Sequence, residues 1–142
     1  VLALIERQKL IAEGAGAVAV AAAMYNKVDI KGKKTVCLLS GGNIDVNILS
    51  RVIARGLMMA GRSSTLTIAL EDKPGQLQGV SEVISRCGGN VVSVHYSQAD
   101  TNMRITSCYL HIGMETRDHA QVEQIKQELT KAGFSIVQTT NG

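Results

Sequence analysis

Aromatic residues are scarce in this chain of 142 residues: they make up 3%, as three Tyr, one Phe and no Trp. Hydrophobic residues reach 45%, so a packed core can form, but it must consist of aliphatic side chains and Met. Surfaces that bind nucleic acid usually combine aromatics with a dense basic stripe, whereas the net charge here is +3. The composition therefore argues against a nucleic-acid partner.

Cysteine and proline are also sparse, at three and one residues. Cys37, Cys87 and Cys108 are widely spaced and no two form a CxxC pair. Such a set predicts a reducing compartment rather than a disulfide framework or a zinc knuckle. The three histidines have no ligand spacing with cysteines or carboxylates, so we expect no metal site.

Long apolar runs are missing. The longest, Ala15 to Tyr25, is mostly alanine and falls short of the about 20 residues that a membrane-spanning helix needs. No signal peptide is recognisable at the start. These features predict a soluble cytoplasmic protein with no membrane partner. Val1 already lies in an amphipathic pattern, which predicts that the chain continues a longer one.

The first 60 residues follow the pattern of the end of an α/β domain. Residues 2–26 predict a helix whose second half is small, apolar and buried on most sides. Residues 35–39, TVCLL, predict a buried strand of the parallel type. After a tight turn, apolar residues at helical spacing predict a helix from Ile44 to Met58, and residues 56–64 predict a linker. One strand cannot form a sheet alone, so we expect this region to be partly disordered, rearranged or swapped into a dimer.

The remaining residues alternate between strand and helix patterns. The predicted elements are strands at 65–70, 92–97, 103–112 and 134–139, and helices at 77–87 and 118–132, the second capped by Asp118 with Gln121. The order βαββαβ requires right-handed crossovers, which predicts an α+β ferredoxin-like fold with both helices on one face of a four-stranded antiparallel sheet. The other face is semi-polar and the edges are free, so we expect dimers.

Two glycine-containing segments are candidates for a ligand site. Ser40 ends the predicted buried strand, where α/β folds bind ligands, and Gly41 and Gly42 lead into a helix N-terminus. The spacing matches neither common phosphate-binding motif, so a plain tight turn stays open. Gly14 and Gly16 each cost about 1 kcal/mol in a helix interior. A fold tolerates that cost where something large approaches the backbone.

Glu13-Gly14-Ala15-Gly16-Ala17, followed by CLLSGGNID at residues 37–45, resembles the end of the catalytic domain of fold-type II enzymes that use pyridoxal 5'-phosphate (PLP). The closest members are the threonine and serine dehydratases and serine racemase. The resemblance implies that the Ser40 hydroxyl meets the pyridine nitrogen of PLP and that Glu13 lies beside the ring, although a structural carboxylate stays open for Glu13. The implied cofactor-binding residues are Glu13, Gly14, Ser40, Gly41, Gly42 and Asn43.

A hydroxyl partner leaves the ring nitrogen neutral, which favours loss of a β-hydroxyl over transamination. This family also needs a Schiff-base lysine and a second glycine-rich loop for the phosphate, and neither is recognisable here. For the parent enzyme, the resemblance implies the conversion of threonine to 2-oxobutanoate and ammonia, as in isoleucine biosynthesis. We expect this chain by itself to hold no PLP, to contain no catalytic residue and to be inactive.

Residues 64–139 resemble an ACT domain, because the βαββαβ order comes with the segment Asp72-Lys73-Pro74-Gly75-Gln76-Leu77. The resemblance implies a site for a small amino-acid effector, isoleucine or valine, and a homo-oligomer formed through the ACT domains. The implied effector-binding residues are Asp72, Gly75, Gln76, Leu77 and Asn90, the last reaching the effector from a partner subunit. A helix cap for Asp72 and a positive φ for Asn90 stay open as plainer interpretations.

The two resemblances divide the chain into residues 1–60, the C-terminal part of a PLP-dependent catalytic domain, and residues 61–142, an ACT regulatory domain. Two other interpretations stay open. One is a stand-alone amino-acid-binding ACT module with a helical leader, and the other is an enzyme of the serine dehydratase or serine racemase type. A mere leader would not need both glycine motifs, and the ACT domain favours threonine ammonia-lyase.

Overall fold

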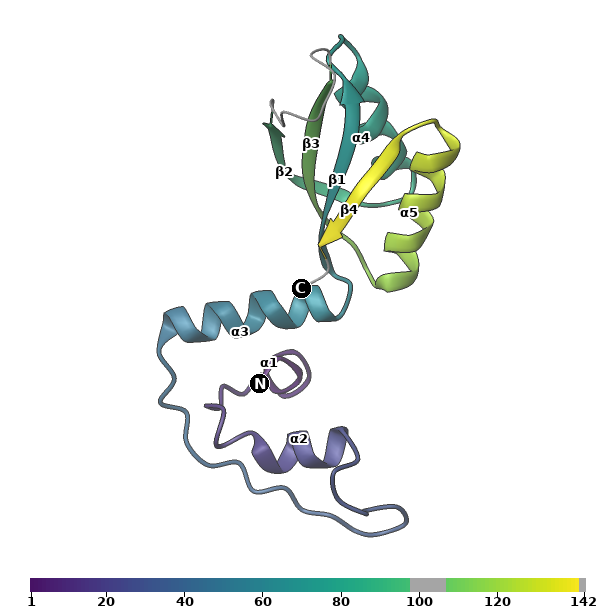
Figure 1. Ribbon diagram of the computed structural model, residues 1–142. Coiled ribbons are helices and arrows are strands. Elements are labelled where there is room, and N and C mark those ends of the chain that lie inside the picture. Colours follow the sequence, from purple (N-terminus) through teal and green to yellow (C-terminus); the bar gives the residue numbers. More distant parts are fainter. Residues whose placement is uncertain (98–106, 141–142) are drawn as a thin grey trace. The chain divides into compact units, whose positions relative to one another are not determined.

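The computed structural model describes residues 1–97 and 107–140, and the chain forms two compact units, Val1–Gly56 and Leu57–Gly142. The first unit contains helices α1 (Leu2–Gln8) and α2 (Val18–Met24) and most of α3 (Val46–Met59), all labelled in Figure 1. The second unit contains the sheet. Residues 103–106 of the third predicted strand lie outside the described residues.

The single helix predicted over residues 2–26 is wrong, because α1 and α2 are separate. Lys9 ends α1 in a left-handed conformation with φ 58°, and its N–H donates to the carbonyl of Leu4. A continuous helix would have had to include Gly14 and Gly16, each at a cost of about 1 kcal/mol. Both glycines instead lie in the turn that leads into α2.

The strand predicted over residues 35–39 is also absent. This segment belongs to no helix or strand and pairs with no described strand, and the side chains of Val36 and Leu38 are 94% and 79% exposed. A buried strand must hydrogen-bond its backbone to a neighbour, and the first unit offers none. The following helix is confirmed within two residues. It is capped by Asp45, whose carboxylate accepts from the N–H groups of Asn47 at 2.8 Å and Ile48 at 3.2 Å.

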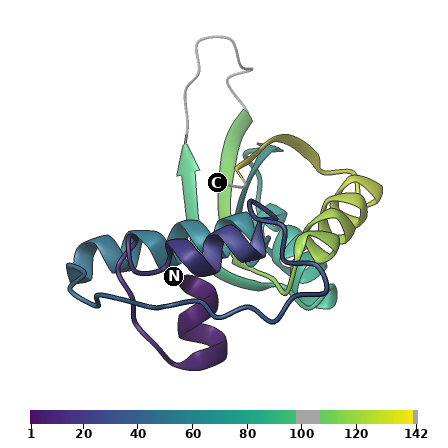
Figure 2. The same cartoon turned by 90° about the horizontal axis from the view of Figure 1, so that it is seen from below.

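The second unit has the predicted βαββαβ order. Its elements are β1 (Ser63–Glu71), α4 (Gln76–Arg86), β2 (Asn90–Ser97), β3 (Ser107–Glu115), α5 (His119–Lys131) and β4 (Ser135–Thr140). The strands form one sheet in the order β2-β3-β1-β4, and each neighbouring pair is antiparallel. Figures 1 and 2 show the sheet from two directions. The ferredoxin-like fold is therefore confirmed.

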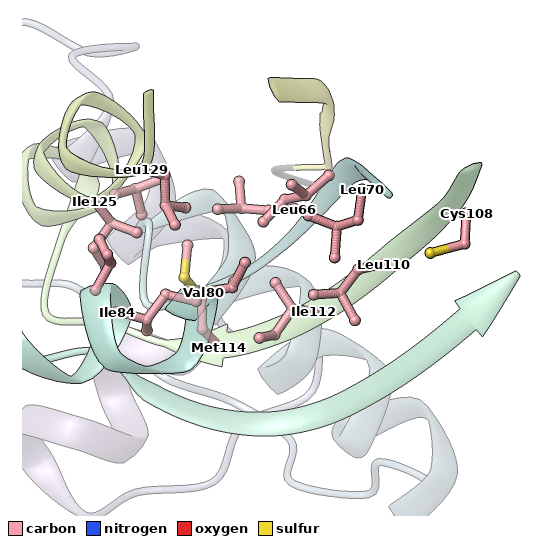
Figure 3. Close-up of a cluster of buried hydrophobic side chains, with 13 residues drawn as sticks. Leu66, Leu70, Val80, Ile84, Cys108, Leu110, Ile112, Met114, Ile125 and Leu129 are labelled. Atoms are coloured by element: carbon pink, nitrogen blue, oxygen red, sulfur yellow. The ribbon is translucent and has the colours of Figure 1, made fainter. Parts of the chain in front are cut away.

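One aliphatic core holds this unit together, as Figure 3 shows. Alternate residues of β1 and β3 point toward α4 and α5. The two helices pack the apolar stripes predicted for them against these residues. The buried members are Leu66, Ile68, Leu70, Val80, Val83, Ile84, Cys108, Leu110, Ile112, Met114, Val122, Ile125 and Leu129. None of these is aromatic, and Phe134 packs only at the margin. The scarcity of aromatics in the sequence therefore matches the core that forms.

The start of α5 differs slightly from the predicted capping box. The Asp118 carboxylate accepts from the N–H of Gln121 at 2.9 Å, as expected for an N-cap. The Gln121 side chain, however, accepts from the N–H of Arg117 at 2.7 Å and donates to the carbonyl of Cys87 at 2.8 Å. Gln121 therefore joins the beginning of α5 to the end of α4, which a purely local capping motif does not predict.

The linker predicted over residues 56–64 is instead a fixed turn. Helix α3 continues to Met59, β1 begins at Ser63, and Gly61 takes a left-handed φ of 68° between them. The Thr116 hydroxyl donates to the carbonyl of Gly61 at 2.5 Å, and a ring nitrogen of His119 lies 2.9 Å from the carbonyl of Met59. We call Met59, Gly61, Thr116 and His119 the clasp. The clasp holds the turn that precedes β1 against the segment that leads into α5.

Among the described side chains, the hydroxyl of Ser64 is buried without a hydrogen-bond partner, and the residue is 2% exposed. We expect Ser64→Ala to raise the free energy of unfolding by about 1 kcal/mol, because it removes a desolvated polar group. Thr67→Val is the matched control, since the Thr67 hydroxyl lies 3.0 Å from a ring nitrogen of His111. It should lower that free energy by about 1 kcal/mol. Urea unfolding measures both, and a loss of stability in Ser64→Ala would contradict this assignment.

Candidate cofactor and effector sites

The first unit brings its two glycine motifs into contact. The N–H of Glu13 donates to the carbonyl of Gly41 at 3.2 Å. A Cβ on Gly16 would overlap the carbonyl oxygen of Ser40, and a Cβ on Gly41 would overlap the carboxylate of Glu13. Glycine at position 16 is therefore what allows the segments to approach, and glycine at position 41 suits the left-handed φ of 79° there. A Cβ on Gly14 would meet no atom within 4 Å, so contacts within the chain do not explain why this residue is glycine.

The groups at this contact are accessible. Ser40 and Asn43 are exposed, Glu13 is half-buried, and Gly42 lies against the carbonyl of Ile11. The exposed Ser40 hydroxyl can donate to the nitrogen edge of a pyridine ring, while the Glu13 carboxylate, which lies next to Gly41, can only accept. The unit's Lys9 and Lys33 donate to the Glu6 carbonyl at 2.7 Å and to the Asp29 carbonyl at 2.8 Å. The residues present thus fit one edge of PLP and do not by themselves make a complete site.

In the second unit, the loop between β1 and α4 leaves a helix N-terminus without a side-chain cap. Gly75 is the N-cap of α4, with a left-handed φ of 89°, and no side chain accepts a hydrogen bond there. Asp72 is therefore not the cap of this helix, and the plainer interpretation of this residue is wrong. The amides of the first turn lack intrahelical partners and carry the positive end of the helix dipole. They can bind a carboxylate.

Asp72 lies in the electrostatic neighbourhood of β2 and β3. Desolvation raises the pKa of the Tyr96 phenol, and the nearby Cys108 and Asp72 raise it further. Desolvation also raises the pKa of the Cys108 thiol, and Asp72 adds to that rise. Nothing in the sequence marks Tyr96 and Cys108 as neighbours of Asp72. Their position near the ends of paired strands becomes informative only once the register, with Tyr96 opposite Leu110, is known.

A recess of about 380 Å³ lies on the other side of the same loop. It is lined by the end of β1, the loop itself and the turn between α5 and β4. The lining residues are Ala69, Leu70, Glu71, Lys73, Gln76, Ala132, Gly133, Phe134 and Ser135. Lys73 is 2.6 Å from Glu71 in an exposed ion pair. Apolar and polar groups therefore surround the loop on both sides.

Asn90 lies at the opposite end of the sheet from Asp72 in the same subunit. It is opposite Glu115, which is opposite Ser63 at the start of β1, and its amide donates to the Glu115 carboxylate at 3.1 Å. The nine residues of β1 span roughly 26 Å at about 3.3 Å each. The plainer interpretation of Asn90 is wrong, because Gly88, with φ 79°, takes the left-handed conformation instead.

The face of the sheet away from the helices carries a short polar chain. The two ring nitrogens of His111 lie 3.0 Å from the hydroxyls of Thr67 and Ser97, and the His95 ring is 6.0 Å away, centroid to centroid. Within the described ranges, no cluster of His, Cys, Asp and Glu could hold a metal ion. Nor does any described helix combine the length and apolarity needed to cross a membrane.

The second unit has the ferredoxin-like strand order β2-β3-β1-β4, and its helix α4 begins without a side-chain cap after the DxPGxL loop. Over most of its length, the chain is similar to one part of L-threonine ammonia-lyases. It is 39% identical over 136 residues to the L-threonine ammonia-lyase of Thermotoga maritima, and 37% over 136 residues to that of Geobacter sulfurreducens. Each match covers 96% of this chain and 34% of the relative, so the chain spans about a third of these relatives' length.

A biosynthetic L-threonine dehydratase of Staphylococcus aureus is 28% identical over 129 residues, which is 91% of this chain and 30% of that protein. No protein-family model matches the chain. Among solved structures, the ACT domain of GTP pyrophosphokinase from Chlorobium tepidum overlaps 56% of this chain and 95% of that one, with a TM-score of 0.42 and 15% identity. The acetolactate synthase small subunit of Thermotoga maritima overlaps 56% and 46%, with a TM-score of 0.44 and 25% identity.

Proposed function

We propose that this chain is the regulatory end of a PLP-dependent threonine ammonia-lyase. In this proposal, the first unit completes the cofactor site and the second binds an amino-acid effector. The observation that carries the proposal is the similarity to two L-threonine ammonia-lyases over 96% of the chain. The contact between the Glu13 and Ser40 segments supports the cofactor half, because both motifs of the resemblance lie at one place.

When bound, PLP would supply the electron sink that allows a proton to leave the α-carbon and a hydroxyl to leave the β-carbon. Ser40 would hold the ring nitrogen through its hydroxyl, which is too weak an acid to protonate it. Glu13 would border the ring, and Gly41, Gly42 and Asn43 would shape the floor beneath it. The chain's own residues would therefore orient the ring and tune it, and we expect the amine that takes the proton to come from another part of the parent enzyme. We expect the chain alone to be inactive.

For the effector half, the amides of Gly75, Gln76 and Leu77 would hold a carboxylate at the N-terminus of α4. Asp72 would accept from the α-ammonium group. A free amino acid presents these two charges two bonds apart, which matches a carboxylate side chain three residues before the N-cap Gly75. A branched aliphatic side chain would then contact the apolar part of the loop, so isoleucine or valine is the proposed effector.

Asn90 can join this site only from another subunit. If two β2 edges pair antiparallel about a two-fold axis, the start of one β2 lies beside the end of the other. Asn90 of the partner subunit would then reach the end of the sheet that holds Asp72. The proposal therefore includes a homodimer through the β2 edge, with one effector site completed at each end of the shared edge.

We expect the full chain to bind isoleucine or valine, measured by isothermal titration calorimetry with serine and threonine as comparison ligands. Asp72→Asn should raise the dissociation constant by about 10- to 100-fold, because a hydrogen bond to a charged group contributes about 1.5–3 kcal/mol. Asp29→Asn, an exposed carboxylate in the first unit, is the matched control and should leave binding unchanged. Heat from none of the four amino acids, or equal binding by both variants, would remove the effector half of the proposal.

A further inference from the structure

The edge of the sheet opposite β2 carries a second surface that suits self-association. Strand β4 ends the sheet, and its sequence, SIVQTT, contains neither a charge nor a proline. Folded proteins usually protect an exposed edge strand with such residues, since its unpaired backbone groups can otherwise join another strand. Val137, in the irregular part of β4, is 55% exposed. Apart from this irregularity, which is itself a feature that can hinder pairing, the β4 edge carries no charged residue or proline against strand pairing.

A groove of about 590 Å³ runs between β4 and α5, next to this edge. Its β4 wall consists of consecutive residues from Ile136 to Thr139. Its α5 wall is a stripe at spacings of three and four residues, so these side chains lie on one face of the helix. The stripe consists of Glu123, Lys126, Gln127, Thr130 and Lys131. We call the β4 edge and this stripe together the β4–α5 surface.

The charges of the stripe are complementary to those of a second copy of the stripe that runs in the opposite direction. Glu123 lies four residues before Gln127 and Lys131 four residues after it. If two α5 helices lie antiparallel about a two-fold axis at Gln127, each Glu123 faces Lys131 of the partner subunit. The two Gln127 amides then meet on the axis, where each can donate to the other. Within one chain these charges make only exposed helical pairs, Glu123 with Lys126 and Lys131 with Glu128, which contribute little and can rearrange.

The spacing of strands and helices fits the same two-fold axis. Antiparallel pairing of two β4 edges would continue the sheet at the usual spacing of about 4.8 Å. A helix that covers two strands of each copy would then lie about 10 Å from its symmetry mate, which is the normal distance between packed helices. Pairing of the edges and contact of the two stripes are thus compatible in one arrangement.

We infer that the β4–α5 surface binds the same surface of a second copy of this chain, in a two-fold arrangement centred on Gln127. This interface goes beyond the proposed function, because it involves neither the effector loop nor the β2 edge. The two edges lie on opposite sides of the sheet, so both can be paired at once. A chain that uses both forms an assembly larger than a dimer, while a chain that uses only the β4–α5 surface forms a dimer without any effector.

Charge reversal tests the register. In sedimentation velocity with the full chain, Glu123→Lys alone and Lys131→Glu alone should each raise the dissociation constant of this interface by about tenfold, because each turns two attractive pairs into two repulsive ones. The double variant Glu123→Lys/Lys131→Glu should return it to near the original value. Rescue is expected only if the two side chains meet across the interface. Two equal single effects without rescue, or no single effect, would overturn the inference.

Edge blocking separates this interface from that of the proposed function. Val137→Lys places a charge on the β4 edge, and Val92→Lys is the matched control on the β2 edge, where Val92 is 53% exposed. We expect Val137→Lys to weaken association through the β4–α5 surface, while the binding of isoleucine persists. Val92→Lys should leave the β4–α5 contact intact. An assembly that Val137→Lys leaves unchanged, or one that only Val92→Lys dissociates, would overturn the inference without touching the effector site.

Discussion

Gly16→Ala is expected to destabilise the first unit by about 3 kcal/mol, at the upper end of the usual cost of overpacking. The new methyl group would occupy the position of the Ser40 carbonyl oxygen. Backbone cannot rotate out of the way as a side chain can, so the Ser40 loop must move away from Glu13. The proposed cofactor contact would then be lost together with the local stability.

Gly14→Ala is the matched control, because it is two residues away in the same turn and its Cβ would meet nothing within 4 Å. We expect it to be neutral or slightly stabilising, since alanine restricts the unfolded chain more than glycine does. Amide hydrogen exchange at Glu13, whose N–H donates to Gly41, reports the contact directly. Protection should fall by about a hundredfold in Gly16→Ala, which corresponds to about 3 kcal/mol, and should persist in Gly14→Ala. Equal protection in both variants would show that the two motifs do not meet.

Gly61→Ala should destabilise the second unit by about 4 kcal/mol. Two effects add: the left-handed φ of 68° costs an alanine about 1 kcal/mol, and its Cβ would overlap the backbone of His119 at about 3 kcal/mol. For a domain of this size, the melting temperature should fall by roughly 20 °C. The clasp would open because Gly61 can no longer lie against the start of α5.

Gly133→Ala separates the cost of the left-handed conformation from the cost of the steric overlap. Gly133 also has a left-handed φ, 89°, but a Cβ there would meet nothing within 4 Å. It should therefore cost only about 1 kcal/mol, or roughly 5 °C in melting temperature. Thermal unfolding followed by circular dichroism compares the two variants. Equal losses would mean that the turn at Gly61 is not packed against His119.

Within the second unit, the clasp replaces the expected flexible linker with a packed turn. The composition of residues 56–64 favours a flexible linker, with two glycines and two serines. The chain instead continues α3 to Met59 and fixes the turn through Thr116 and His119, which are more than fifty residues further along. No local pattern marks these two side chains as partners of the turn.

The second unit was predictable because its local signals agree with one another. Leu66, Ile68 and Leu70 alternate along β1, and the same residues form the core under α4 and α5. Asp118 was recognisable as a helix cap, and it is one. Each strand of this sheet has its pairing partners within the same chain, so the pattern of apolar residues and its structural solution coincide.

The first unit was only partly predictable for the opposite reason. The apolar run at residues 35–39 has the composition of a buried strand, but no neighbouring strand is available in the first unit to accept its hydrogen bonds. The run from Ala15 to Met24 reads as one helix with the residues before it, yet Lys9 ends α1. The periodicity of apolar residues indicates which side chains could be buried. It does not indicate whether a neighbouring strand or helix is present to cover them.

The sequence by itself determined the order of elements in residues 63–140, the aliphatic character of their core and the two glycine motifs that suggest a cofactor. Only the tertiary structure decided that Gly16 and Ser40 touch, that Asp72 and Asn90 lie at opposite ends of the sheet, and that α5 and β4 share one groove. Residue patterns reflect contacts between near neighbours in the chain. The distances between distant segments follow from strand register and packing, which form only when the whole unit folds.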